Sequence, residues 1–122
     1  MSKPIITISN QDCDTIYDLL EKEPYNANHS LLIEELGRAN IVNTNEVPNN
    51  VVKMNSTVEF TVLENKDVFS LKLVYPKDMK GDGTISILSP IGSALIGLSV
   101  GQEIEWPLNN NKKTVVHINS IT

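Results

Sequence analysis

The chain of 122 residues is 40% hydrophobic, and its 15 acidic residues against 10 basic ones give a net charge of −5. This length suits one domain, or a domain with a small appendage, and the acidic balance argues against non-specific binding to nucleic acid, which requires clustered Lys and Arg. The single cysteine, Cys13, excludes an internal disulfide and is typical of a reducing compartment.

The N-terminal segment predicts a helix after an extended lead-in. Residues 5–8 are rich in isoleucine, and Ser9 follows as the expected helix N-cap, with Asp12 as a weak capping-box partner. The helix should end near Glu23, because Pro24 disfavours helical geometry in the residue before it. Its apolar stripe is expected to comprise Cys13, Ile16, Tyr17, Leu19 and Leu20.

A second helix is predicted to begin at Asn28 or Ser30. Its apolar stripe recurs at helical spacing in Leu32, Leu36 and Ala39. The residues expected to face solvent are Glu34, Glu35 and Arg38. Two short amphipathic helices joined by a few residues form an antiparallel helical hairpin, here a short coiled coil.

Beyond the turn-rich stretch 43–50, the apolar period changes from helical to two. We therefore expect a boundary there, with residues 1–46 forming the helical hairpin and residues 47–122 forming a sheet domain. Five short antiparallel strands are predicted, over residues 58–62, 69–75, 85–87, 104–108 and 115–121. With one short helix against a face of this sheet, the predicted fold class is α+β.

The most informative segment runs from Ser89 to Trp106. Pro90 suits the first position of a short helix, because its missing N–H would be unsatisfied there anyway. Gly97 and Gly101 stand where the chain needs a positive φ, at the end of this helix and in the next turn. The pattern of the segment, SPIG-ALIG--VG-EIE, resembles the C-terminal domain of the GreA/GreB transcript-cleavage factors, which bind the secondary channel of bacterial RNA polymerase.

The resemblance covers essentially the whole chain. Three further patterns are similar to those of short members of the same family. They are EL-RA over residues 35–39, VV-MNS-V-F over residues 51–60 and LVYP--M over residues 73–79. The resemblance implies an FKBP-like C-terminal sheet and an N-terminal coiled coil that points into the polymerase channel.

The resemblance also bears on catalysis. In Gre factors, acidic residues at the coiled-coil tip hold a second Mg²⁺ that activates the cleaving water, and Glu21 and Glu23 lie near the predicted tip. Helices of roughly 12 to 15 residues give a hairpin of only about 18 to 22 Å, whereas Gre hairpins are much longer. Because a carboxylate must come within coordination distance of the metal, we expect Glu21 and Glu23 to be solvated, with no metal, no cofactor and no catalytic residue.

The turn before the short helix is where Gre factors grip the rim of the channel. By motif position, the contact candidates are Ser89, Pro90 and Ile91. Leu88 departs from the family here, because Gre factors tend to carry an acidic residue at that position. A purely structural alternative is that Ser89 only caps the helix and Pro90 only starts it.

The sequence thus predicts a non-enzymatic regulator that binds RNA polymerase at the rim of the secondary channel and competes with longer Gre-type factors without stimulating cleavage. We expect a cytoplasmic monomer with no sequence-specific nucleic-acid binding and no membrane partner, since no apolar run approaches the about 20 residues of a membrane span. Two alternatives stay open: a Gre-like cleavage-stimulating factor, and a regulator that acts on nucleoside diphosphate kinase.

Overall fold

The computed structural model describes residues 5–22, 27–107 and 113–122. The first part of the chain contains β1 (Thr7–Ser9), α1 (Asn10–Lys22), α2 (Ala27–Arg38) and β2 (Asn40–Val42). The second part contains β3 (Thr57–Val62), β4 (Asp67–Val74), β5 (Thr84–Ser86), α3 (Pro90–Leu95), β6 (Glu103–Pro107) and β7 (Lys113–Ile121). Helices packed beside a mostly antiparallel sheet confirm the predicted α+β class.

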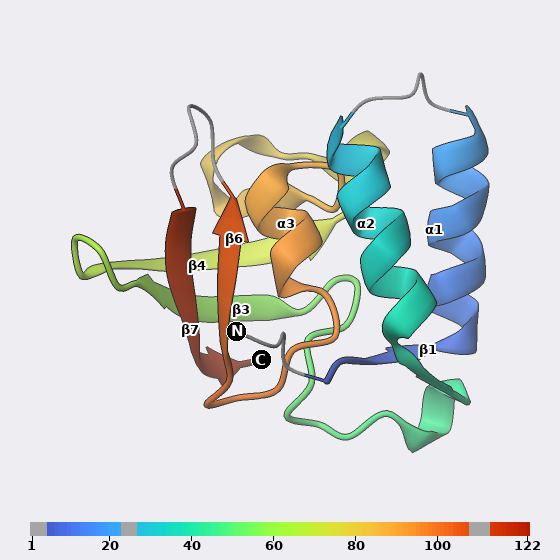
Figure 1. Cartoon of the computed structure of the whole chain (residues 1–122), viewed down its shortest axis with the longest axis horizontal. Coiled ribbons are helices and arrows are strands. Elements are labelled where there is room, and N and C mark those ends of the chain that lie inside the picture. Colours follow the sequence, from blue (N-terminus) through green and yellow to red (C-terminus); the bar gives the residue numbers. More distant parts are fainter. Residues whose placement is uncertain (1–4, 23–26, 108–112) are drawn as a thin grey trace.

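α1 and α2 lie beside one another at one end of the molecule, and α3 lies nearer its middle (Figure 1). α1 and α2 run in opposite directions, and α2 lies between α1 and α3. Ser9 caps α1 as predicted, because its Oγ accepts a hydrogen bond of 3.0 Å from the N–H of Asp12. The helix ends at Lys22, close to the predicted end at Glu23, which lies outside the described residues.

A single cluster of buried side chains joins the helices to the sheet. Ile16 of α1, Leu32 of α2 and Leu95 of α3 are fully buried in it, together with Val58 and Ile118 of the sheet. The two predicted segments therefore share one core. Their division into residues 1–46 and 47–122 remains a prediction.

The five strands follow the order β5-β4-β3-β7-β6. The prediction that all five are antiparallel is wrong, because β5 pairs with β4 in parallel, with Thr84 opposite Lys72. Between these strands the chain forms two 3₁₀ turns, Pro76–Asp78 and Gly81–Gly83, which bring it back along β4. A three-residue strand carries no signal of its direction in the sequence.

The isoleucine-rich lead-in becomes part of a second sheet that the sequence did not predict. β1 pairs in parallel with β2, with Ile8 opposite Ile41. On its other side, the N–H of Thr7 donates to the carbonyl oxygen of Gly97 over 3.1 Å. β1 therefore ties the helical segment to the loop that follows α3.

The expectation that Glu35 faces solvent is also wrong. Its side chain is 2% exposed and forms an ion pair with Arg38, one turn along α2. The physical reason is that α2 lies between α1 and α3, so more than one of its faces is buried. A carboxylate in such a position requires a partner, and Arg38 provides one.

Candidate functional site

The predicted contact turn is held by its own hydrogen bonds. The Ser89 hydroxyl donates to the carbonyl oxygen of Ser86 over 2.7 Å and accepts from the N–H of Gly92 over 3.0 Å. Pro90 is thus the first residue of α3, as the sequence predicted, and Ser89 is its N-cap, the role that the structural alternative gave it. The Ser89 hydroxyl makes both of these hydrogen bonds inside the turn. The half-buried side chains of Pro90 and Ile91 are therefore the main contact candidates that remain in the turn.

The turn also depends on close backbone approach at Gly92. A Cβ on this residue would lie 2.0 Å from the carbonyl oxygen of Ser86, far inside van der Waals contact. Next to it, the buried Ser93 hydroxyl donates to the carbonyl oxygen of Ile87 over 2.8 Å. The turn is therefore a preformed surface feature.

Replacing Ser89 with alanine is expected to lower the free energy of unfolding by about 1 to 2 kcal/mol, because the cap of α3 is lost. Urea denaturation followed by circular dichroism measures the change. Ser120→Ala, at an exposed serine of β7, is the matched control and should leave stability almost unchanged. Equal stability of the two variants would contradict the capping role of Ser89.

Ile91 forms one wall of an apolar pocket of about 330 Å³. The pocket is also lined by Phe60 of β3 and Phe69 of β4, whose ring centroids are 5.6 Å apart. Phe60 is buried, whereas Phe69 is 42% exposed. The remaining lining residues are Val62, Glu64, Asn65, Leu71, Ile85 and Thr114.

The sequence alone did not locate this pocket. Phe60 lies in the predicted strand 58–62 and Phe69 in the predicted strand 69–75. In the structure they are directly opposite in the β3–β4 register. A cross-strand pair of phenylalanines in a chain with only 5% aromatic residues was the available signal.

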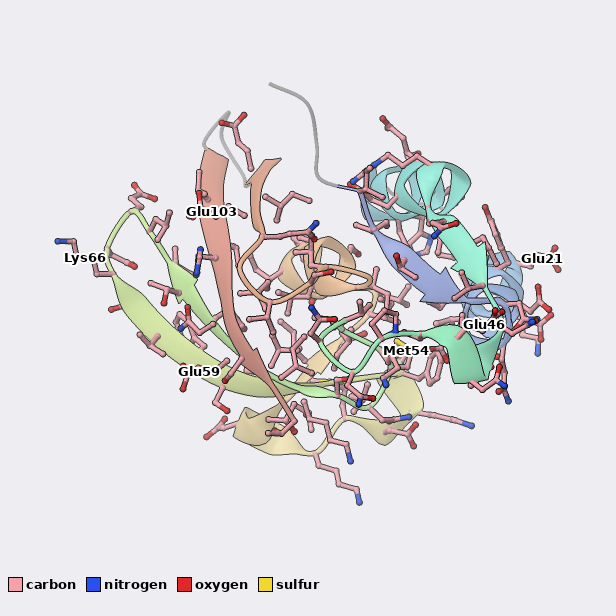
Figure 2. The ribbon with its side chains drawn as sticks, turned by 90° about the horizontal axis from the view of Figure 1, so that it is seen from below. Glu21, Glu46, Met54, Glu59, Lys66 and Glu103 are labelled. Atoms are coloured by element: carbon pink, nitrogen blue, oxygen red, sulfur yellow. The ribbon has the colours of Figure 1, made fainter. Side chains whose placement is uncertain are left out.

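Of the two candidate tip residues, Glu21 lies at the C-terminal end of α1. Figure 2 shows Glu21 at one end of the molecule and Lys66, in the β3–β4 turn, at the other. Glu21 is exposed, and Glu23 lies outside the described residues. Among the described residues, no group of three or more His, Cys, Asp or Glu side chains could hold a metal ion. None of the described helices has the length and apolar character of a membrane span.

Tyr75, in the LVYP segment, lies where α1 meets the sheet. Burial and, to a smaller extent, the nearby Asp12 carboxylate raise the pKa of Tyr75 to about 12, against an opposing hydrogen bond with Thr15. Asp12 itself accepts a hydrogen bond of 3.3 Å from the N–H of Met54. Burial nevertheless raises the pKa of Asp12. This junction therefore favours a neutral phenol.

A tyrosine with a raised pKa predicts a loss of stability in alkali. The folded protein binds the phenol proton more tightly than the unfolded chain, whose tyrosine pKa is about 10. The stabilising contribution of Tyr75 is therefore complete below pH 10 and lost as the pH rises toward 12. We expect Tyr75→Phe to reduce the slope of stability against pH in this range, measured by urea denaturation. Tyr17→Phe, at an exposed position, should keep the wild-type slope.

Comparison with known proteins places these features in a family. A family model described as "Transcription elongation factor, GreA/GreB, C-term" matches residues 47–122. The chain is also 38% identical over 121 residues to the regulator of nucleoside diphosphate kinase of Escherichia coli K12, a match that covers 97% of this chain and 89% of that protein. The chain belongs to the GreA/GreB family. This confirms the resemblance found in the sequence, including its similarity to short members of the family.

Two further relatives show how much of a GreA/GreB protein this chain matches. A solved structure described as a prokaryotic transcription elongation factor GreA/GreB from Nitrosomonas europaea is 45% identical, with a TM-score of 0.78 and coverage of 98% of this chain and 99% of that one. GreA of Syntrophobacter fumaroxidans is 39% identical over 75 residues, which are 60% of this chain but only 47% of that protein. The similarity to a full GreA thus reaches about half of its length.

Proposed function

We propose that this GreA/GreB-family chain is a non-enzymatic regulator of transcription that docks on RNA polymerase at the rim of the secondary channel. The observation that carries the proposal is the preformed turn Ser89–Ile91 with the apolar pocket beside it. Open apolar hollows on a protein surface are typical of sites that bind a partner. Here Ile91 joins the pocket to the turn, so turn and pocket offer one continuous surface, which we name the docking surface.

The short helices support binding without cleavage. α1 has 13 residues and α2 has 12, so each extends only about 20 Å. We propose that residues 47–122, as an FKBP-like domain, dock on the rim while residues 1–46 partly fill the channel entrance as a short coiled coil. Glu21 and Glu23 would then stay beyond coordination distance of the active-site Mg²⁺. In this account the protein acts in the cytoplasm as a monomer.

Two assays on core RNA polymerase test the proposal. In the first, polymerase is immobilised and binding of the wild-type protein is measured by biolayer interferometry. We expect saturable binding in the micromolar range or tighter. In the second, backtracked elongation complexes are incubated with the protein, and the RNA should stay uncleaved. If the folded protein does not bind, RNA polymerase is not its partner. If the RNA is cleaved, the protein is a cleavage-stimulating factor.

The name of the Escherichia coli relative supports a second candidate function, regulation of nucleoside diphosphate kinase. In this alternative the docking surface would contact the kinase. Titration of purified kinase with the protein, followed by interferometry and phosphotransfer activity, decides between the two. Binding to the kinase and not to polymerase would favour the alternative.

A further inference from the structure

The docking surface contains one polar group that its surroundings do not satisfy. Thr114 of β7 lines the apolar pocket and is only 3% exposed. Its Oγ1 is buried and has no hydrogen-bond partner among the described residues. Native structures leave few such groups, because a buried hydroxyl without a partner has lost its hydration and gained nothing.

The other side chains that line the pocket provide no hydrogen-bond partner for the Thr114 hydroxyl. Phe60, Ile85 and Ile91 carry no polar side-chain atom. The polar lining residues Glu64 and Asn65 are exposed, and the Asn65 side chain accepts a hydrogen bond from the N–H of Asp67 over 3.1 Å.

The Thr114 side chain can turn its hydroxyl toward a ligand in the pocket. Rotation about its Cα–Cβ bond to another staggered rotamer moves the hydroxyl into the position that the methyl group held, while the methyl group moves to the position of the Cβ hydrogen. The hydroxyl can either donate or accept a hydrogen bond. A ligand with a polar group in the pocket could therefore recruit a hydroxyl that is sealed from water when the pocket is empty.

We propose that Thr114 determines the specificity of the docking surface: its hydroxyl hydrogen-bonds a peptide group of the partner segment whose apolar side chain fills the pocket. The inference rests on the proposed function for the identity of that partner, a segment of RNA polymerase. A protein segment suits the pocket better than a pure hydrocarbon, because every inserted side chain brings its own backbone N–H and C=O. The exposed Glu64 at the rim and the net charge of −5 favour basic residues beside the inserted side chain.

A matched pair of variants tests the role of the hydroxyl. Thr114→Val keeps the shape of the side chain and removes the hydroxyl, whereas Thr114→Ser keeps the hydroxyl. We expect Thr114→Val to be at least as stable as the wild type in urea, since it removes an unsatisfied polar group, yet to bind core polymerase about five-fold more weakly. Thr114→Ser should bind polymerase within two-fold of the wild type. Equal affinity of Thr114→Val and the wild type would overturn the proposal.

A second experiment separates this inference from the proposed function. Benzamide carries an apolar ring and an amide that models a peptide group, whereas benzene carries the ring alone. In NMR titrations the wild type should prefer benzamide to benzene, with shifts at Thr114 and Ile91, and Thr114→Val should lose this preference. That result stands even if polymerase does not bind. The same preference in wild type and Thr114→Val would refute the role of Thr114.

Discussion

Replacing Gly97 with alanine is expected to lower the free energy of unfolding by about 3 kcal/mol. Two penalties add at this position. Gly97 has a φ of +82°, which is strained for any residue with a Cβ, and that Cβ would lie 2.8 Å from the Cβ of Ile6. Relief of the clash would push β1 away from the carbonyl oxygen of Gly97, to which the N–H of Thr7 donates.

Two other glycines serve as matched controls for Gly97. Gly81 also has a positive φ, +65°, but a Cβ there meets nothing within 4 Å, so Gly81→Ala should cost only about 1 to 2 kcal/mol. Gly37 lies exposed in α2 with open space around it, and Gly37→Ala should stabilise the protein by up to about 1 kcal/mol. Urea denaturation of all three variants measures these changes in the free energy of unfolding. A cost at Gly97 no greater than at Gly81 would contradict the tight contact with β1.

Replacing Ile91 with glutamate is expected to weaken binding to RNA polymerase at least ten-fold. Ile91 is half-buried at the mouth of the apolar pocket, and a carboxylate there would have to lose its hydration when a partner covers it. The fold should tolerate the change, because a negative charge is favourable near a helix N-terminus and Ile91 is the second residue of α3. Interferometry on immobilised core polymerase gives the affinity.

The control for Ile91→Glu is a charge of the same sign outside the pocket. Val68 of β4 is 59% exposed and does not line the pocket, so Val68→Glu should bind almost as tightly as the wild type. If both variants bind equally weakly, a carboxylate weakens binding wherever it is added, and the pocket does not set the affinity. If Ile91→Glu binds like the wild type, the docking surface is assigned to the wrong residues. Ser89 is less suitable for this test, because its hydroxyl holds the turn itself.

Local signals in the sequence predicted the elements that depend on neighbouring residues. The cap at Ser9, the start of α3 at Pro90 and the positive φ of Gly97 and Gly101 are all confirmed. Each follows from the hydrogen bonds and the backbone angles available to a few consecutive residues. The alternation in β3 was equally readable, with Val58 and Phe60 buried.

The sequence did not predict the features that depend on which segments meet in space. The burial of Glu35 follows from α2 lying between two other helices, and the β1–β2 pairing joins residues separated by two helices. The apolar pocket arises likewise, where strands β3, β4, β5 and β7 meet the start of α3. For the candidate site, the sequence located the turn Ser89–Ile91, whereas the pocket beside it and the unsatisfied hydroxyl of Thr114 required the fold.

Competition on RNA polymerase is the direct test of docking at the rim of the secondary channel. A labelled Gre-type factor is bound to core RNA polymerase, and the unlabelled protein is titrated in while fluorescence anisotropy reports displacement. We expect complete displacement by the wild type, and displacement by Ile91→Glu only at concentrations at least ten-fold higher. If the folded wild type displaces no factor at tens of micromolar, the protein does not act at the secondary channel.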